Sequence, residues 1–471
     1  ATHCIGTVHT LNESRLRPSE DRPYPRSTEA MPPDKGLRPG LALVTILKGM
    51  IGAGILALPQ VFGKVRLALA VPGYLVVTAV CAFSVWRLIQ CKAMLRGSEK
   101  EVLVGCRDQS DYEDASSLSE GEPSSRARRE DDFGLGPLAQ VGHRTLGPGG
   151  VVLAGLGVVV SQLGFCVAYV GVAVETLRGP HLLGPRVSPL LLRLALGLVL
   201  GALCLIRRLE HIAKLSGLAL FVYCYLLWAL VWHGSHALLS ADEPPAPSVW
   251  TPVDWHGMGV WFGTAIFAQE AIVISQYVYD EMQLENPRDF LPVLVGSFSI
   301  CGGVSAFVGG FGYFCYGDEI ADVFYLNFPA GSIDVALAEG VLCVVLLASF
   351  VLQLYPVVSF AEAMASRLKE AGQSGSSSGS DTAVVQWAPA VAVRWGLVLL
   401  VSLAAAGIPN LSCVSGYSGS FAMSLIGFFL PPLCHIKAHR CELSPLDWAG
   451  NLLLLSAGCA AVVFGVLTTS C

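Results

Sequence analysis

The sequence predicts an all-α protein that crosses a membrane about eleven times. Three observations lead to this fold class. The chain is 53% hydrophobic and only 14% charged, with a mean hydropathy of +0.58. Apolar runs long enough to cross a bilayer recur along most of its length, and Lys and Arg are concentrated in alternate connections between those runs. This composition excludes a water-soluble enzyme and is typical of a polytopic membrane protein.

The apolar runs set the expected number of helices. About twenty apolar residues cross the ~30 Å hydrocarbon core as an α-helix. Runs of that order lie at 41–63, 66–90, 148–177, 188–206, 211–232, 257–279, 290–316, 332–363, 388–407, 411–436 and 446–468. They predict about eleven transmembrane helices, which places the two ends of the chain on opposite sides of the membrane.

The distribution of Lys and Arg predicts which side each end occupies. With the N-terminus inside, the inner connections contain Lys92, Arg96, Lys100, Arg207, Arg208, Arg288, Arg367, Lys369, Lys437 and Arg440. The outer connections contain only Lys64, Arg66, Arg178 and Arg186. Because cytoplasmic loops carry the excess of positive charge, the N-terminus is predicted to be cytosolic.

Three polar segments lie outside the predicted helices. Residues 1–38 are rich in Pro, Arg and Glu and predict a disordered cytosolic tail, so that 39–471 form the transmembrane domain. Residues 97–132 and 370–383 lack the apolar content to fold and are interpreted as solvated cytosolic insertions. The fifteen cysteines have no paired spacing, so most are interpreted as packing residues and a disulfide framework is not expected.

The first apolar run predicts an interrupted helix. Between residues 46 and 59 it contains three glycines within six positions, a lysine and a proline. If the hydrocarbon begins near Leu41, Gly52 lies about 16 Å deep, close to the membrane midplane. Irregular backbone at that depth must line a cavity or be covered by protein, and transporters use such helix ends to bind small charged solutes.

The sixth apolar run carries the matching signal. Its residues 263–271 place Thr264, Gln269 and Glu270 roughly 10 to 20 Å from the boundary near Gly257. A carboxylate at this depth costs about 2.5–3.5 kcal/mol on insertion scales, so Glu270 is predicted to face a polar interior or to titrate. A proton relay or ligand contact is the favoured interpretation. The alternative is a structural acceptor for unwound backbone N–H groups.

At this point several motifs, taken together and in order, resemble a known family. They are Leu47–Leu56 followed by Leu58-Pro59, Gln162–Cys166, Gly263–Glu270, Glu285–Arg288, Gly312–Asp318, Leu352–Pro356, Ile408-Pro409 and Pro431-Pro432. This set resembles the amino acid/auxin permease superfamily, and is most similar to its proton-coupled amino-acid transporters and their vacuolar relatives. The resemblance covers about residues 40–470, apart from the two insertions.

The resemblance implies a LeuT-like fold and a substrate site. This fold consists of a repeat of five helices, an inverted copy of that repeat and one further C-terminal span. The first helix of each repeat, helix 1 and helix 6, is broken. An amino acid's carboxylate would bind backbone N–H groups at Ile51, Gly52, Ala53 and Gly54. Its ammonium would bind carbonyls of Thr264, Ala265, Phe267 and Ala268. Its side chain would face Gln162, Phe165, Gln269 and Gln353.

The sequence also departs from the family pattern. Animal proton-coupled members often carry a His three residues before the span-one lysine, where this chain has Thr45. The proton is therefore assigned to Glu270. Gln269 and Ala271 replace an aromatic residue and a glycine, which favours a small or polar neutral amino acid as substrate. Lys48 is interpreted either as a gating residue or as a lysine that snorkels to the inner surface.

Two further expectations concern titratable groups away from the breaks. Glu175 and Glu339 are placed near outer helix ends, where snorkelling or water would make a buried charge unnecessary. The histidines at 211, 233, 256 and 435 lie near predicted helix ends, so solvated or capping roles are favoured over proton transfer.

The leading functional prediction is a transporter that moves an amino acid together with H⁺ by alternating access. A Na⁺-coupled transporter of the same fold and an amino-acid sensor with little flux remain as alternatives. The sequence shows no catalytic or metal-binding motif, so no enzyme activity, cofactor, metal site or nucleic-acid partner is predicted. The host membrane is left open between the plasma membrane and an acidic organelle such as a vacuole or lysosome.

Overall fold

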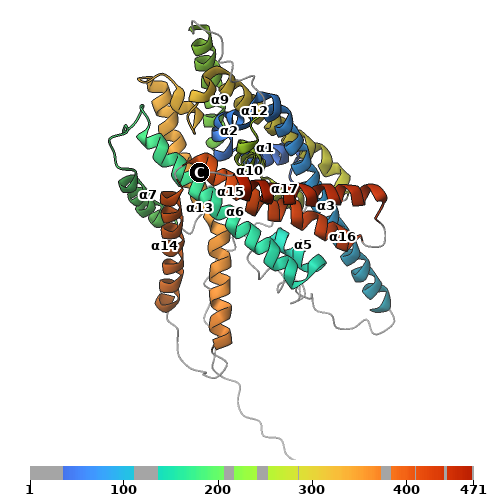
Figure 1. Cartoon of the computed structure of the whole chain (residues 1–471). Coiled ribbons are helices and arrows are strands. Elements are labelled where there is room, and N and C mark those ends of the chain that lie inside the picture. Colours follow the sequence, from blue (N-terminus) through green and yellow to red (C-terminus); the bar gives the residue numbers. More distant parts are fainter. Residues whose placement is uncertain are drawn as a thin grey trace, which may run out of the picture. The chain divides into compact units, whose positions relative to one another are not determined.

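The computed structural model describes residues 36–110, 136–205, 217–240, 253–284, 286–372, 383–408, 410–439 and 443–468. Apart from Gly36, these residues belong to one compact unit, Leu37–Cys471. All the regular secondary structure within the described ranges is helical, which confirms the predicted all-α class (Figure 1). Residues 1–35 of the predicted tail, 111–132 of the first predicted insertion and 373–382 of the second lie outside these ranges. Residues 97–110, which were expected not to fold, instead continue a helix.

The main helices coincide with the apolar runs, although two of them extend well beyond the predicted ends at residues 90 and 363. Their bounds are α1 Pro39–Met50, α2 Ala53–Val65, α3 Leu67–Ser110, α5 Pro137–Leu146, α6 Pro148–Arg178, α7 Pro189–Leu203, α9 Ala219–Ser240, α10 Met258–Ala268, α11 Ile272–Met282, α12 Leu291–Tyr316, α13 Ile333–Gly372, α14 Ala383–Gly407, α15 Leu411–Ser418, α16 Leu430–Ala438 and α17 Pro445–Thr468. The short helix α5 is amphipathic and packs against α6 and α16, and it was not predicted.

By length and apolar composition, seven helical stretches in the described ranges can each cross a membrane, or eight when the bent pair α1 and α2 is counted as one span. The helices α7 and Val391–Gly407 are apolar but shorter. The chain is therefore a multi-span membrane protein, while the full set of eleven crossings stays a prediction.

The predicted interruption of the first span is present. Helix α1 ends at Met50, α2 begins at Ala53, and the two are bent by 57°. Ile51 and Gly52 between them have extended backbone. The proline that follows, Pro59, lies inside α2 and does not interrupt it.

The sixth span is interrupted at the expected place. Residues 269–271 leave helical geometry between α10 and α11. A third irregularity, which was not predicted, divides the stretch 411–438 into α15, two π-helical turns at Gly419–Met423 and Leu425–Phe429, and α16. Such turns often accompany functional sites in helical proteins.

The two interrupted spans pack side by side along both halves. Helix α2 packs on α10, and α1 packs on α11. A Cβ atom added at Gly54 would lie 2.9 Å from the Cα of Ala268. At the other end, the N–H of Leu37 donates to the carbonyl of Glu281 at 2.9 Å. Small residues thus let the two backbones approach closely.

Other helices hold this pair from the sides. Helix α12 packs on α2, α15 and its following turn pack on α10, and α6 packs on α13 and α15. Cβ atoms added at Gly263 or Gly419 would overlap the backbone of Gly416 and of Gly263, respectively. Helix α10 at Gly263 therefore packs directly on the backbone of α15 and of the turn that follows it, and this contact admits no larger residue.

The cysteines follow the prediction with one correction. Ten cysteines of the described residues are free, and most of them are buried as packing residues. Cys413 in α15, however, takes part in a disulfide bond. Sequence spacing could not reveal it, because a disulfide depends on the distance between residues in the folded chain.

Candidate functional site

The candidate site lies where the two interruptions meet. The N-terminus of α2 faces the C-terminus of α10 through the close contact between Gly54 and Ala268, with the ring of Phe267 3.1 Å from the same added Cβ. On the other side of the breaks, the side chain of Ile274 in α11 contacts Gly49 in α1. The structure therefore brings Gly54 of the predicted range 51–54 beside Phe267 and Ala268 of the predicted range 264–268.

The exposed helix ends give this region its polarity. Gly52 precedes α2 in extended backbone, and no side chain caps that helix. The first N–H groups of a helix have no partner within it, and its N-terminus carries a partial positive charge. The C-terminus of α10 contributes carbonyl groups of opposite polarity. An anion and a cation can thus be bound within one small region.

Helix α6 covers the interruption with aromatic side chains. The rings of Phe165 and Phe267 lie with centroids 4.4 Å apart. The Tyr169 hydroxyl is 3.8 Å from the position of a Cβ at Gly52. Gln162, one turn before Phe165, is buried, and its side-chain oxygen has no hydrogen-bond partner in the described part of the chain. A buried amide oxygen without a partner is costly unless a ligand or water supplies a donor.

Two of the predicted residues, Gln269 and Thr264, direct their side chains to other helices. Gln269 donates from its amide nitrogen to the Tyr74 hydroxyl at 3.0 Å and to Thr78 at 2.9 Å, both on α3. The Thr264 hydroxyl lies 2.8 Å from that of Ser415 on α15. These contacts fasten α10 to its neighbours, so Thr264 can serve the site only through its backbone carbonyl.

The remaining predicted residues have less defined surroundings. Gln353 is partly buried on α13, the helix that packs along α6. Lys48 is partly buried in the last turn of α1, two residues before the helix ends. A lysine at a helix C-terminus is favoured by the helix dipole, and this location agrees with both the gating and the snorkelling interpretation.

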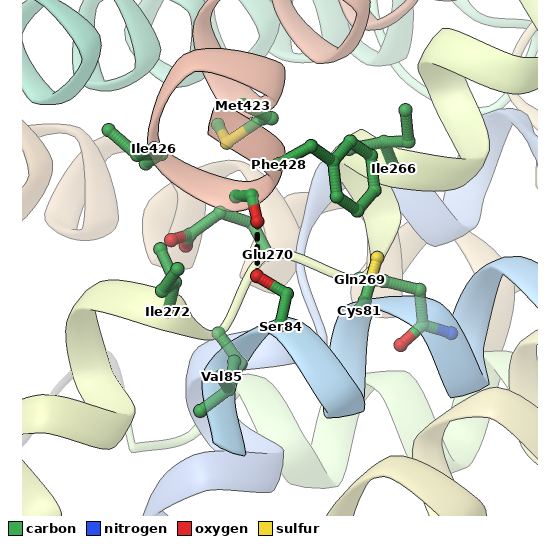
Figure 2. A pocket seen from close by; sticks show the side chains of 12 residues that line it. Cys81, Ser84, Val85, Ile266, Gln269, Glu270, Ile272, Met423, Ile426 and Phe428 are labelled. Atoms are coloured by element: carbon green, nitrogen blue, oxygen red, sulfur yellow. Dashed lines mark hydrogen bonds between the residues drawn. The ribbon is translucent and has the colours of Figure 1, made fainter. Parts of the chain in front are cut away.

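Glu270 lines a small cavity on the side of the break that faces α3 and the π-helical turns. Figure 2 shows its carboxylate on one side of that cavity, with Gln269 pointing in another direction. The cavity has a volume of about 30 Å³, enough for one or two water molecules. Ser84 on α3 donates across it to the carbonyl of Gly427. A water here would contact both a carboxylate and polar backbone.

Glu270 also has a structural contact. Its carboxylate accepts from the N–H of Val273 at 3.4 Å, a long hydrogen bond at the N-terminus of α11. This contact agrees with the alternative in which Glu270 holds unwound backbone. The carboxylate therefore touches both the cavity and the start of α11, so its charge state affects the half-helix that follows the break.

One polar cluster was placed wrongly by the sequence. His435 was expected to be solvated or to cap a helix end, but it is buried on α16, with Asn451 of α17 at 3.1 Å and Arg87 of α3 at 3.1 Å. Arg87 donates to Asp447 at 2.7 Å. Arg87 could have predicted this cluster. It is a charged residue inside the apolar run 66–90, and a charge at that position requires a buried polar partner.

Glu339 is a second correction. It was expected at an outer helix end in contact with water, but it is completely buried in the second turn of α13. Its carboxylate lies 2.9 Å from Nδ1 of His181, which comes from the connection after α6. Neither residue belongs to a recognisable motif, and their pairing depends on two segments 158 positions apart.

Two interrupted helices whose polar ends meet within the spanning region are typical of membrane transporters for small solutes. The sequence model of the family described as transmembrane amino acid transporter protein matches residues 38–470, so the chain belongs to that family. The predicted superfamily and the predicted absence of an enzyme activity are thereby confirmed.

Several relatives extend this comparison. The chain is 26% identical over 462 residues to "Amino acid transporter AVT3A" of Arabidopsis thaliana. The aligned region covers 96% of this chain and 92% of the relative. It is 28% identical over 262 residues to "Vacuolar amino acid transporter 3" of Saccharomyces cerevisiae, covering 55% of this chain and 35% of the relative. "Amino acid transporter AVT1B" of Arabidopsis thaliana is 26% identical over 290 residues, covering 62% and 49%.

Proposed function

We propose that this protein is a secondary active transporter that moves small neutral amino acids together with H⁺ by alternating access. The proposal includes the LeuT-like arrangement of eleven spans. It rests above all on one observation, the contact between two interrupted helices at Gly54 and Ala268. Each interruption supplies peptide groups of one polarity, and a zwitterion requires both.

The amino-acid backbone binds between the breaks in this proposal. The carboxylate accepts hydrogen bonds from N–H groups in the range 51–54, where the bare N-terminus of α2 favours an anion. The ammonium donates to carbonyls in the range 264–268 at the end of α10. The close ring contact between Phe165 and Phe267 limits the room for the substrate side chain, which supports a small amino acid.

Glu270 is the proposed proton carrier. Its carboxylate faces a cavity of water size and accepts from the first turn of α11. Protonation would remove the negative charge that stabilises this helix N-terminus. Helix α11 is held at its other end by Asp280, which accepts from Lys92 at 2.5 Å and also from Arg96. A change at Glu270 would thus act on a half-helix with one fixed end.

The cellular setting follows from two lines of support. One relative is named a vacuolar transporter, so an acidic organelle is a suitable host, and the plasma membrane remains the other. The excess of Lys and Arg in alternate connections supports a cytosolic N-terminus. In either membrane, the proton gradient would drive amino acids into the cytosol.

Reconstituted uptake under an imposed pH gradient tests the proposal. We expect wild-type protein to accumulate labelled alanine, serine or proline more than leucine or tryptophan. The Glu270→Gln variant should lose gradient-driven accumulation and keep exchange. Glu175→Gln is the matched control, because Glu175 is also a carboxylate within a span but is 35% exposed and pairs with Arg178 at 3.8 Å.

Three results would contradict parts of this account. Equal accumulation by wild type and Glu270→Gln would remove Glu270 from coupling. Uptake that follows a Na⁺ gradient and ignores pH would favour the Na⁺-coupled alternative. Binding of an amino acid without measurable flux would favour a sensor.

A further inference from the structure

A buried acid–imidazole pair lies away from the amino-acid site and has no role in the mechanism above. It consists of Glu339 on α13 and His181 in the connection between α6 and α7. Both side chains are completely buried. The carboxylate oxygen Oε1 of Glu339 lies 2.9 Å from Nδ1 of His181, and Nε2 of His181 lies 3.1 Å from the carbonyl oxygen of Pro329.

The geometry fixes how many protons this pair holds. A carbonyl oxygen can only accept, so Nε2 of His181 must carry a proton and donate to Pro329. The contact between Nδ1 and Glu339 then needs one further proton, which resides on either the nitrogen or the carboxyl oxygen. Without it, a nitrogen lone pair would face a buried carboxylate. The pair in this arrangement therefore holds one removable proton.

The surroundings offer little to stabilise the deprotonated pair. The second oxygen of Glu339 has no hydrogen-bond partner in the ranges that the structure describes. Among the described residues, titratable and charged groups lie on the elements around the pair. These are Tyr223 and His233 on α9, Tyr325 on η6 (Phe324–Asn327), Asp334 and Cys343 on α13, and Glu175 with Arg178 at the end of α6. No ion pair between Glu339 and a Lys or Arg occurs among the described residues.

The pair fastens a connection that packs on α2, the helix whose N-terminus forms part of the proposed amino-acid site. Pro329 belongs to the connection 317–332 between α12 and α13. In that connection η6 packs on α2, and the hydroxyl of Tyr325 lies 2.6 Å from Thr176 on α6. Asp322 accepts from the N–H of Ser412 at 3.2 Å, at the start of α15. The connection thus joins α2 and α15 to α6 and α13.

We propose that His181 and Glu339 form a proton-binding site that holds the connection 317–332 in place when protonated and releases it when the proton leaves. Loss of the proton leaves the neutral imidazole with one N–H for two acceptors. The buried carboxylate of Glu339 takes that N–H at Nδ1, because an unpaired buried charge is the costlier alternative, and the carbonyl of Pro329 then loses its donor. The proton site stands independently of transport, and only its control of access to the amino-acid site rests on the proposed function.

Hydrogen exchange of the full chain in lipid nanodiscs, followed by mass spectrometry of the peptide covering 317–332, tests the proposal. Glu339→Gln is the informative variant, because its amide N–H can donate to Nδ1 of His181 while Nε2 still donates to Pro329. It therefore keeps the protonated contacts with no removable proton. Glu175→Gln is the control on the neighbouring helix.

We expect wild type and Glu175→Gln to gain at least tenfold in exchange between pH 5.5 and pH 8, after correction for the intrinsic chemistry. Glu339→Gln should change less than twofold and match wild type at pH 5.5. His181→Ala, which leaves Glu339 unpaired, should exchange rapidly at both pH values. Wild-type exchange that is independent of pH, or a His181→Ala segment as protected as wild type at pH 5.5, would overturn the proposal.

Uptake measured on the same samples separates this inference from the proposed function. A wild-type protein that moves no amino acid but shows the pH-dependent exchange refutes transport and supports the proton site. A protein that accumulates amino acids, but whose hydrogen exchange in 317–332 depends neither on pH nor on the Glu339→Gln substitution, refutes the proton site alone.

Discussion

Replacement of Gly52 by alanine tests the binding site without disturbing the fold. Gly52 has a φ of −145°, an extended backbone that any L-residue adopts, so alanine brings no backbone strain. The added Cβ would lie 3.8 Å from the Tyr169 hydroxyl, an ordinary van der Waals contact, with no nearer atom of another segment. The folded protein should therefore retain its stability to within about 1 kcal/mol.

Binding should nevertheless weaken, because the methyl group lies at the N–H groups that the substrate carboxylate approaches. Loss of one hydrogen bond to a charged group costs about 1.5–3 kcal/mol. That corresponds to a rise in KM of roughly 10- to 150-fold. The assay is uptake as a function of alanine concentration in proteoliposomes, together with thermal unfolding of the same preparation in detergent.

Gly54→Ala provides the contrast, since its Cβ would lie 2.9 Å from Cα and 3.1 Å from Cβ of Ala268. Overpacking of this kind costs about 1–3 kcal/mol, so Gly54→Ala should lower the melting temperature. Gly52→Ala should not. A Gly52→Ala protein with wild-type KM would refute the reasoning, because the carboxylate could not then lie against this part of α2.

Two further predictions concern the segments around the site. Asp280→Asn should destabilise the protein by roughly 3 kcal/mol, the lower end of the range for a broken buried pair, because the Asp280 side chain is 29% exposed while that of Lys92 is 7% exposed. Thermal unfolding of this variant is compared with that of the exposed control Asp289→Asn. Equal melting temperatures of the two variants would contradict the prediction. Burial raises the pKa of the Asp322 carboxyl above its usual value, although hydrogen bonds from α15 oppose this shift. The ionised form is therefore disfavoured in the folded protein. The contribution of Asp322 to the free energy of unfolding is greatest at low pH and is lost as the pH rises. The melting temperature of wild type relative to Asp322→Asn should therefore rise from pH 7 to pH 4, and a constant difference would show that Asp322 does not titrate differently on folding.

The sequence was informative where local chemistry decides the structure. The glycines at 49, 52 and 54 and the polar run at 269–270 predicted both helix breaks, because backbone freedom and the cost of a mid-membrane carboxylate are properties of the residues themselves. The apolar runs also located the spanning helices, although they gave neither the extension of α3 to Ser110 nor the short helix α5.

The sequence was less informative where partners come from distant segments. Gln269 was assigned to the substrate, yet its amide donates to Tyr74 and Thr78 on α3. Glu339 was expected to contact water, yet its partner lies on another connection. Spacing along the chain fixes the depth of such a side chain but not the direction in which it points, which depends on how the helices pack.

The location of the bound amino acid tests the central claim most directly. An experimentally determined map of the full chain with alanine bound should show the ligand's carboxylate within hydrogen-bond distance of backbone N–H groups in 51–54 and its ammonium at carbonyls of 264–268. Density for alanine elsewhere, or continuous helices through residues 51–52 and 269–271, would contradict the account.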